Sequence, residues 1–509
     1  MDTKVPKGLT KVSKVSSVSV LGMEARPVEV EVHIDGGLEQ FHIVGLPSAA
    51  VRESRQRVRS AILSSCEDWP KTKVTVNLAP GDLRKEGSLL DLPLAIGILA
   101  AGGTLTRERA SGYLFMGELA LDGRLRPVRG AIAAAITARE LGKGLVLPRD
   151  NSPEAQLVPG VHVVGVETLI EAMGFANGEL DPDVGRPKSL PDLLDLEKVA
   201  YPDMADVRGQ AMARRALEVA AVGGHNLLMV GPPGSGKTML AQRFPGILPP
   251  MGAEEALEVT RVWSVAGLLP PGAALLTSRP FRAPHHHASP ASVIGGGHPL
   301  PGPGEISLAH RGVLFMDELP LFSRAVLEAL RQPLEEGMVI IARTGATVRF
   351  PAQFALIAAA NPCPCGKAGD EREVCSCPLG RLDQYRSRLS GPLLDRIDIQ
   401  VEVARLTEDE LLAVSPGESS AEIGARVIAG RKRIKERREA EPEWTEGLEA
   451  LDHPTRALLR SAFRELPASA RAFHRTLAVA RSIADLESVE RVEEAHVAEA
   501  LQLRRAVWR

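Results

Sequence analysis

The fold is decided by the stretch Gly231-Pro232-Pro233-Gly234-Ser235-Gly236-Lys237-Thr238, which is a complete Walker A motif. An apolar run, 226–230, precedes it and a helical pattern opens at Lys237, so the motif lies in the strand–loop–helix context that it requires. The glycines let backbone N–H groups surround phosphates, and the helix N-terminus adds partial positive charge. We therefore predict that all eight residues bind ATP, with Lys237 at the β- and γ-phosphates and Thr238 on Mg²⁺.

A second apolar run, 312–316, ends in Asp317-Glu318 and resembles a Walker B motif. We expect a buried parallel strand, because both of its faces are apolar. Asp317 would coordinate Mg²⁺ through water, and Glu318 would polarise the attacking water. Asp-Glu after a strand can also cap a helix, but the Walker A motif upstream favours the catalytic interpretation.

Other segments match further parts of an AAA+ ATPase. The strand 355–360 ends at Asn361, which resembles sensor 1, although a turn before Pro362 is the plainer alternative. Arg396 lies where an arginine finger acts on a neighbouring subunit; a surface ion pair with Asp395 or Asp398 is the alternative. Arg471 resembles sensor 2, or is one of many surface arginines. The segment expected against adenine includes Val207, Gly209 and Gln210.

Four of the five cysteines form a candidate metal site: Cys363, Cys365, Cys375 and Cys377. Four thiolates favour tetrahedral Zn²⁺, although the Cys-x-Cys spacing is less common than Cys-x₂-Cys. Free thiols or redox-active pairs are the alternatives. Cys66 is expected to be a core thiol. For the consecutive histidines 285–287 we expect hydrogen bonds or a subunit contact, since neighbouring side chains of an extended loop point in alternate directions.

The composition limits the number of domains and the kinds of binding surface that the chain can form. The chain has 509 residues, enough for about three domains, and its net charge of −3 shows no overall basic excess. Only 4% of residues are aromatic, which argues against broad base-stacking surfaces. No stretch approaches the roughly 20 apolar residues of a membrane span, and no signal peptide is evident. We expect a cytoplasmic protein with no membrane partner.

We predict an α/β protein with three units: an N-terminal domain at 1–176, an ATPase core at 201–400 that includes the cysteine knuckle 363–377, and a helical lid at 401–509. Residues 177–200 are rich in Pro, Asp and Gly and are expected to be a linker.

The blocks 279–286, 302–310 and 361–366 resemble the YifB/ComM family of magnesium-chelatase-like AAA+ ATPases over nearly the whole chain. The resemblance implies a Lon-protease/ribosomal S5-like N-terminal domain, an AAA+ core with a parallel sheet and a helical C-terminal lid. For its ComM branch it also implies a hexameric helicase that promotes DNA branch migration during natural transformation.

The N-terminal domain is expected to lack peptidase activity. The resemblance to Lon places Leu89 at the position of the nucleophile, with Ser88 one residue early, and Ala134 at the position of the catalytic lysine. Neither leucine nor alanine can supply the nucleophile or the base that this chemistry needs.

DNA contacts are expected on loops that face a central pore. The segment 338–350 is typical of a β-hairpin with its turn near 344–345, which places Arg343 near the tip as a phosphate contact. The Gly-rich loop 294–298 is a second candidate. The basic run 431–438 could neutralise phosphates, or it could be a solvated helix face.

Three hypotheses follow, of which an ATP-dependent protease is weakened by Leu89 and Ala134. The first is a homo-oligomeric ring, a hexamer, that binds branched or single-stranded DNA and hydrolyses ATP to move along it. The second is a magnesium-chelatase-like ATPase that remodels a protein partner. The N-terminal domain argues against the second, because the resemblance implies that the chelatase subunit lacks it.

Overall fold

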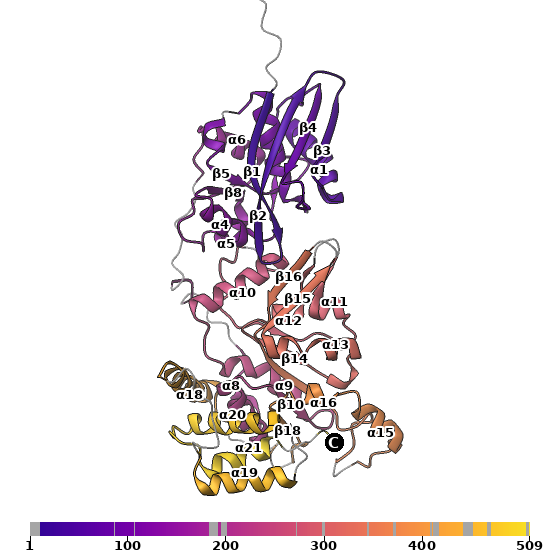
Figure 1. Ribbon diagram of the computed structural model, residues 1–509, viewed down its shortest axis with the longest axis vertical. Helices are drawn as coiled ribbons and strands as arrows, with labels where there is room; N and C mark the ends of the chain where they lie inside the picture. Colours follow the sequence, from indigo (N-terminus) through magenta and orange to yellow (C-terminus); the bar gives the residue numbers. More distant parts are fainter. Residues whose placement is uncertain are drawn as a thin grey trace, which may run out of the picture.

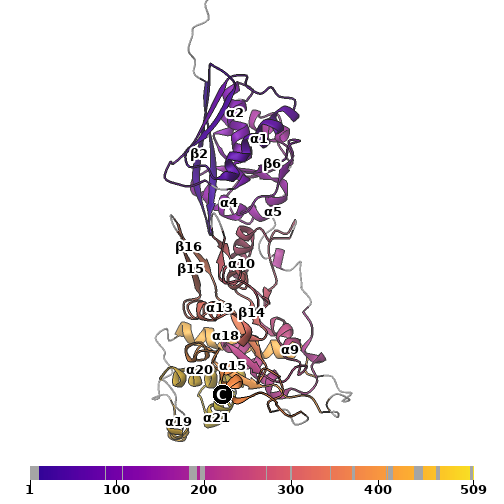
Figure 2. The same ribbon diagram turned by 90° about the vertical axis from the view of Figure 1, so that its right-hand side faces the viewer.

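The computed structural model describes residues 11–85, 87–105, 107–182, 192–194, 201–270, 272–297, 301–343, 346–369, 373–407, 410, 417–440, 451–465, 470–504 and 508. The molecule is elongated: the N-terminal unit lies at one end, the phosphate-loop unit in the middle and the C-terminal helices at the other end (Figures 1 and 2).

The N-terminal unit is built on a seven-stranded mixed sheet in the order β3-β4-β2-β1-β5-β8-β9. Alternation explains its long strands: Val28, Val30 and Val32 are buried, and the residues between them are not. The strands are β1 (Lys11–Leu21), β2 (Glu24–Asp35), β3 (Gln40–Val44), β4 (Lys73–Ala79), β5 (Tyr113–Phe115), β8 (Gly144–Pro148) and β9 (Val163–Val166).

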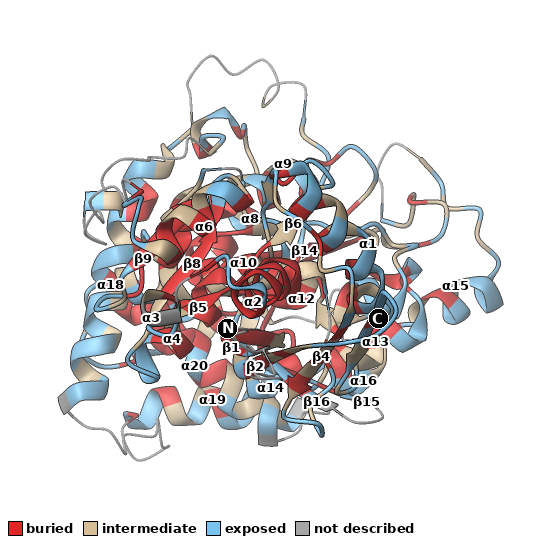
Figure 3. Ribbon diagram, turned by 90° about the horizontal axis from the view of Figure 1, so that it is seen from above, coloured by how far each residue is buried: buried red, intermediate tan, exposed pale blue. Residues whose placement is uncertain are grey.

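Helix α2 (Asp91–Gly102) forms the centre of this unit. It is apolar on all sides and buried over almost its whole length, as expected of a helix enclosed by protein (Figure 3). The other N-terminal helices and short strands are α1 (Ala49–Ser64), α3 (Arg107–Ala110), α4 (Ala131–Glu140), α5 (Ser152–Ala155), α6 (Leu169–Asn177), β6 (Glu118–Leu119) and β7 (Leu125–Arg126).

The central unit contains a five-stranded parallel sheet in the order β11-β14-β17-β10-β18. Its strands are β11 (Phe281–Arg282), β14 (Val313–Met316), β17 (Ala355–Ala360), β10 (Leu227–Val230) and β18 (Ile399–Glu402). The helices are α8 (Ala211–Gly223), α9 (Lys237–Arg243), α10 (Ala253–Ala266), α11 (Pro290–Ile294), α12 (Glu305–Leu308), α13 (Arg324–Ala329), α14 (Pro333–Glu336), α15 (Leu379–Arg386) and α16 (Gly391–Leu394).

Two antiparallel pairs project from this core: β12 (Gly295–Gly296) with β13 (Gly302–Pro303), and β15 (Met338–Arg343) with β16 (Ala346–Pro351). Helix α10 packs toward the N-terminal unit, because Ala256 and Val259 belong to the same apolar core as that sheet. The Gly130 N–H also donates to the carbonyl of Ser264, 3.2 Å away.

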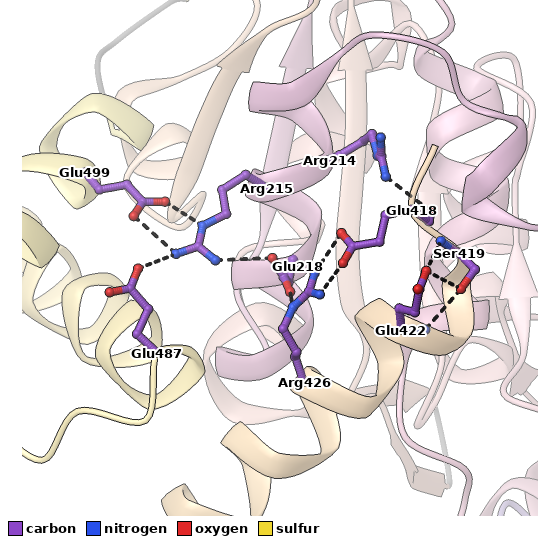
Figure 4. A network of polar contacts seen from close by, with 9 residues as sticks. All are labelled: Arg214, Arg215, Glu218, Glu418, Ser419, Glu422, Arg426, Glu487 and Glu499. Atoms are coloured by element: carbon purple, nitrogen blue, oxygen red, sulfur yellow. Dashed lines mark hydrogen bonds and ion pairs between the residues drawn. The ribbon is translucent and has the colours of Figure 1, made fainter. Parts of the chain in front are cut away.

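The C-terminal helices are α18 (Ser420–Ala440), α19 (His453–Glu465), α20 (Ala470–Leu486) and α21 (Glu494–Leu503). A polar network fastens them to α8 (Figure 4). Arg215 of α8 contacts Glu218, Glu487 and Glu499, and Arg426 of α18 contacts Glu218 at 2.5 Å. The helices are therefore held to the core by charge pairs as well as by apolar packing.

The α/β class with a P-loop core and helical C-terminus is confirmed, as are the predicted strands and helices that flank the motifs. Most of the predicted linker, 183–191 and 195–200, lies outside the described residues. In the part of the chain that the structure describes, no helix combines the length and apolar character needed to cross a bilayer.

The expectation that Cys66 is a core thiol is wrong, because its side chain is exposed. Helix α1 ends just before it, and Cys66 adopts a left-handed backbone conformation with φ 61° while its N–H donates to the Leu63 carbonyl. A residue in this helix-ending position turns the chain out of the helix and leaves its side chain in solvent.

Candidate functional site

The phosphate loop connects β10 to α9, with Gly234 at φ 78° and Gly236 at φ 92°. These left-handed positions suit glycine and let the backbone curl around an anion. Lys237 is almost fully buried, and its Nζ donates to the carbonyls of Gly231 and Pro232 at 2.7 and 2.8 Å. Burial lowers the pKa of Lys237, while Asp317 and Glu318 raise it. The ammonium is thus held at the mouth of the loop.

The two Walker motifs meet at the carboxyl edge of the parallel sheet. Thr238 Oγ1 donates to Asp317 Oδ2 at 2.9 Å, which brings the two predicted Mg²⁺ ligands together. A hydroxyl and a carboxylate are oxygen donors of the kind that Mg²⁺ prefers. The donor set therefore fits a magnesium ion between α9 and β14.

Asn361 lies at the end of β17, next to both motifs. Its Oδ1 is 3.4 Å from Lys237 Nζ, so the predicted sensor 1 residue borders the phosphate loop. Its carbonyl accepts a hydrogen bond of 3.1 Å from Tyr385 of α15. Burial raises the pKa of the Tyr385 phenol and keeps it a donor. Sequence reasoning missed Tyr385, because a tyrosine 24 positions away carries no local signal.

Glu318 has a partner that the sequence did not reveal. Its backbone is left-handed, with φ 53°, and its Oε2 lies 3.3 Å from Nδ1 of His286. The rings of His285 and His286 stack with centroids 4.2 Å apart, and the ring of His287 is tilted against His286 with centroids 4.3 Å apart. The expected hydrogen bonding is present, since the His287 N–H donates to His285 Nδ1 at 3.2 Å. The expected alternate orientation is wrong, because the segment turns: the Ala288 N–H donates to the His285 carbonyl at 2.8 Å. His286 instead links the loop after β11 to the predicted catalytic glutamate.

The predicted adenine segment lies beside the phosphate loop. Gln210 adopts φ 53°, and its side-chain Nε2 donates to the carbonyls of Ser235 at 3.3 Å and Ala404 at 2.6 Å. Val207 is buried, and Gly209 is left-handed at φ 57°. A Cβ at Gly209 would approach Leu406 Cδ2 to 2.8 Å, so only glycine fits without a shift. The segment thus connects the phosphate loop to the chain that follows β18.

Arg396 lies at the opposite edge of the sheet. Strands β10 and β18 pair in parallel, with Leu227 opposite Ile399, so the residues before β18 lie at the amino edge and the phosphate loop at the carboxyl edge. A four-residue strand separates the two edges by about 13 Å. Arg396 therefore does not reach the phosphate loop of its own chain.

Arg396 and Arg471 meet on one carboxylate, Glu335 of α14. Arg396 Nη2 lies 2.7 Å from Glu335 Oε1, and Arg471 contacts the same oxygen. Backbone carbonyls of Arg331 and Pro392 accept from the remaining Arg396 groups. The predicted sensor 2 and the predicted finger are thus one cluster, joined by a glutamate that the sequence did not single out.

The four cysteines of the knuckle converge. All four Sγ atoms lie within 4.8 Å of one another, and three of the pairs are 3.3–3.6 Å apart. Zinc–sulfur bonds of about 2.3 Å in a tetrahedron imply sulfur–sulfur distances of about 3.8 Å, so the donor set fits zinc. The Lys367 N–H and the Cys363 thiol lower the pKa of Cys365 to about 6, whereas burial raises the pKa of Cys377, so Cys365 is the thiol that more readily takes the thiolate form.

This knuckle touches the phosphate loop. Gly366, between the cysteine pairs, adopts φ 79°, and a Cβ there would lie 2.6 Å from Pro233 Cδ. Cys363 is buried two positions after Asn361. The knuckle therefore abuts two segments of the candidate nucleotide site.

The predicted hairpin 338–350 is confirmed as β15 and β16, paired from Met338–Pro351 to Arg343–Ala346. Its turn, 344–345, lies outside the described residues, so Arg343 as a DNA contact stays a prediction. The hairpin packs against the N-terminal unit: a Cβ at Gly22, in the β1–β2 turn, would lie 2.2 Å from Val348 Cγ1.

In the N-terminal unit, Leu89 and Ala134 are both buried in the apolar core. Ser88 Oγ contacts the Glu118 carboxylate. The absence of peptidase activity stays a prediction, which depends on the side chains at positions 89 and 134.

Three sequence families match successive parts of the chain. Residues 203–411 match "Magnesium chelatase, subunit ChlI", 30–151 match "Subunit ChlI of Mg-chelatase", and 417–504 match "Magnesium chelatase, subunit ChlI C-terminal". Since the second match falls in the N-terminal unit, that unit does not distinguish this chain from chelatase-type proteins.

Relatives span nearly the whole chain. YifB of Escherichia coli strain K12 is 42% identical over 499 residues, with 97% of each chain covered. Competence protein ComM of Haemophilus influenzae is 42% identical over 500 residues, again with 97% of each chain covered. The magnesium-chelatase 38 kDa subunit of Rhodobacter capsulatus is 25% identical over 288 residues, which cover 53% of this chain and 76% of that protein.

Proposed function

Because the chain belongs to the YifB/ComM family of magnesium-chelatase-like AAA+ ATPases, we propose that it is a ring-forming motor that hydrolyses ATP to act on DNA. We propose that the energy of ATP hydrolysis drives branch migration or unwinding of DNA during recombination or natural transformation. The observation that carries the proposal is the division of the site: the phosphate loop and the arginine pair lie at opposite edges of one sheet.

The binding half uses the carboxyl edge. The phosphate loop, from Gly231 to Thr238, would hold the phosphates of ATP, while Thr238 and Asp317 hold Mg²⁺. Glu318 would orient the attacking water, and Asn361 would contact the γ-phosphate or that water. Val207, Gly209 and Gln210 would border the adenine. When bound, Mg²⁺ neutralises charge that develops on the phosphate oxygens.

The second half comes from a neighbouring copy. Arg396 cannot reach its own phosphate loop, so it would stabilise the transition state in the next subunit, an effect of about 10³–10⁵ in rate in other systems. Arg471 shares Glu335 with Arg396, and we propose that it faces the same neighbour. A closed ring, a hexamer, gives every site both halves.

Zinc is the proposed structural metal. Cys363, Cys365, Cys375 and Cys377 would hold it as four thiolates, and their spacing fits the tetrahedron. Elemental analysis of the purified protein should find about one zinc per chain. A fully metal-free protein with normal thermal stability would refute the assignment.

The proposed DNA activity is tested by ATP turnover with and without DNA. The protein should hydrolyse ATP faster with branched or single-stranded DNA, and Glu318→Gln should abolish turnover while retaining ATP binding. Equal turnover with every DNA form would refute the DNA assignment and leave the ATPase intact. Stimulation by a protein instead would favour the chelatase-like alternative, which the similarity to the Rhodobacter subunit supports.

A further inference from the structure

The basic run 431–438, which the sequence singled out, lies in α18 and is partly engaged by contacts to α8, to α20 and within α18 itself. Arg431 Nε donates to the Ala221 carbonyl at 2.8 Å, and Arg437 forms a two-fold contact with Asp485 at 2.6 and 2.7 Å. Lys432 and Lys435 pair with glutamates one turn later on the same helix. Two of its arginines, Arg431 and Arg437, are therefore committed to contacts with other helices.

Helix α19 carries a different basic row. Arg456, Arg460 and Arg464 follow one another at four-residue intervals, and His453 lies one turn before them. Successive arginines on such a row are about 6 Å apart along the helix, and the four side chains stay within one face. They line a common surface hollow with Ala457 and Ser461.

This row faces away from the core. The opposite side of α19 is anchored by Thr455 and Leu459, which are fully buried, whereas Arg460 and Arg464 are exposed. Within the described ranges no ion pair of 4.0 Å or less joins the three arginines to a carboxylate. Arg456 donates to the Asp452 carbonyl at 3.4 Å and, after hydrogen bonds from Thr455, contributes to lowering the pKa of the Asp452 carboxyl. Among the described residues, Arg460 and Arg464 are thus exposed cations outside any ion pair, and Arg456 has only the nearby Asp452 carboxylate.

We propose that the exposed face of α19 binds the phosphate backbone of a DNA strand. This inference rests on the proposed function, and it adds a contact site outside the pore loops. Guanidinium groups bind phosphate through paired N–H donors, so a row of three at intervals of about 6 Å offers several phosphate contacts on one helix face. Contacts to phosphates contribute to affinity but do not distinguish one base sequence from another.

The test uses the full-length protein and a fluorescein-labelled single-stranded oligothymidylate, with binding followed by anisotropy over a range of salt concentrations. The variant is Arg456→Gln/Arg460→Gln/Arg464→Gln. The matched control is Lys432→Gln/Arg433→Gln/Lys435→Gln, which removes the same charge from the exposed side of α18. Thermal unfolding and DNA-free ATP turnover of both variants should equal those of the unchanged protein.

The α19 variant should bind more weakly, and the slope of log affinity against log salt should fall by about 2, because each lost phosphate contact of a single strand removes about 0.7. The control should keep the original slope. Equal slopes for the α19 variant and the unchanged protein, or a loss confined to the α18 control, would overturn this inference and leave the DNA motor standing. If the protein without substitutions does not bind oligothymidylate, both the α19 site and the proposed action on DNA are refuted.

Discussion

Glu335 is the residue on which both candidate trans-acting arginines converge. Its carboxylate contacts Arg396 at 2.7 Å and also Arg471, so it offsets the repulsion between two guanidinium groups. The neighbouring Glu336 of the same helix contacts Gln332 instead, at 2.8 Å. The two glutamates provide a natural comparison of a positioning residue with a surface residue.

Glu335→Gln should lower kcat about tenfold and leave the affinity for ATP unchanged, because binding uses the other edge of the sheet. Glu336→Gln should leave both quantities unchanged. Steady-state turnover together with equilibrium binding of a nucleotide analogue separates the two effects. An increase in kcat for Glu335→Gln would show that the carboxylate withholds Arg396 rather than positioning it.

The residues that the sequence identified at this scale are those with a local signal. The Walker A glycines, Asp317 and Asn361 lie at fixed offsets from apolar strands, so spacing alone brings them to one sheet edge. His286, Glu335 and Tyr385 reach their partners only through tertiary packing. No spacing rule encodes those contacts. The histidines and Cys66 were misjudged for a local reason, because the backbone turns at both places.

Among the elements, two contacts join parts that are distant in the sequence, one at the nucleotide site and one at the β15–β16 hairpin. The cysteine knuckle abuts the phosphate loop through Gly366 and Pro233, and the β1–β2 turn abuts the β15–β16 hairpin through Gly22 and Val348. Both are close approaches at glycines with positive φ. The sequence predicted the knuckle and the hairpin as elements, but not what each one touches.

Removing the proposed zinc should weaken ATP binding without any change to the Walker A residues. The knuckle holds Gly366 against Pro233, and unbound thiols no longer fix that loop. The measurement is nucleotide affinity before and after treatment with a chelator, followed by addition of Zn²⁺ alone. Affinity that is indifferent to the chelator, while zinc is shown to leave, would contradict this coupling.

Gly22→Ala should destabilise the protein more than Gly142→Ala. Both glycines have nearly the same backbone, φ 61° and φ 63°, so the intrinsic cost of a left-handed alanine, about 1 kcal/mol, is shared. Only at Gly22 does the new Cβ meet Val348; Gly142 has no atom within 4 Å of that position. Unfolding free energies measure the difference, and Val348→Ala should restore part of the loss in Gly22→Ala. Equal losses for the two variants would argue against the contact.

At the scale of the whole molecule, the direction of the parallel strands places the two halves of the candidate ATP site at opposite edges of the sheet. The phosphate loop ends β10 at one edge, and Arg396 precedes β18 at the other. A polar network and apolar packing hold the C-terminal helices to α8 (Figure 4). Arg471 shares Glu335 with Arg396, so it lies on the same side. The family and the α/β core were predictable from motifs, whereas the sharing of Glu335 required the folded arrangement.

The most direct test of shared sites is to mix two inactive variants, Arg396→Ala and Lys237→Ala. Each alone should turn over ATP at a rate near background, because one lacks the trans arginine and the other the phosphate-binding lysine. In mixed rings, an Arg396→Ala subunit supplies an intact phosphate loop and its Lys237→Ala neighbour supplies an intact arginine, so ATP turnover should reappear on mixing. Full turnover by Arg396→Ala alone, or no recovery in rings shown to contain both variants, would contradict the account.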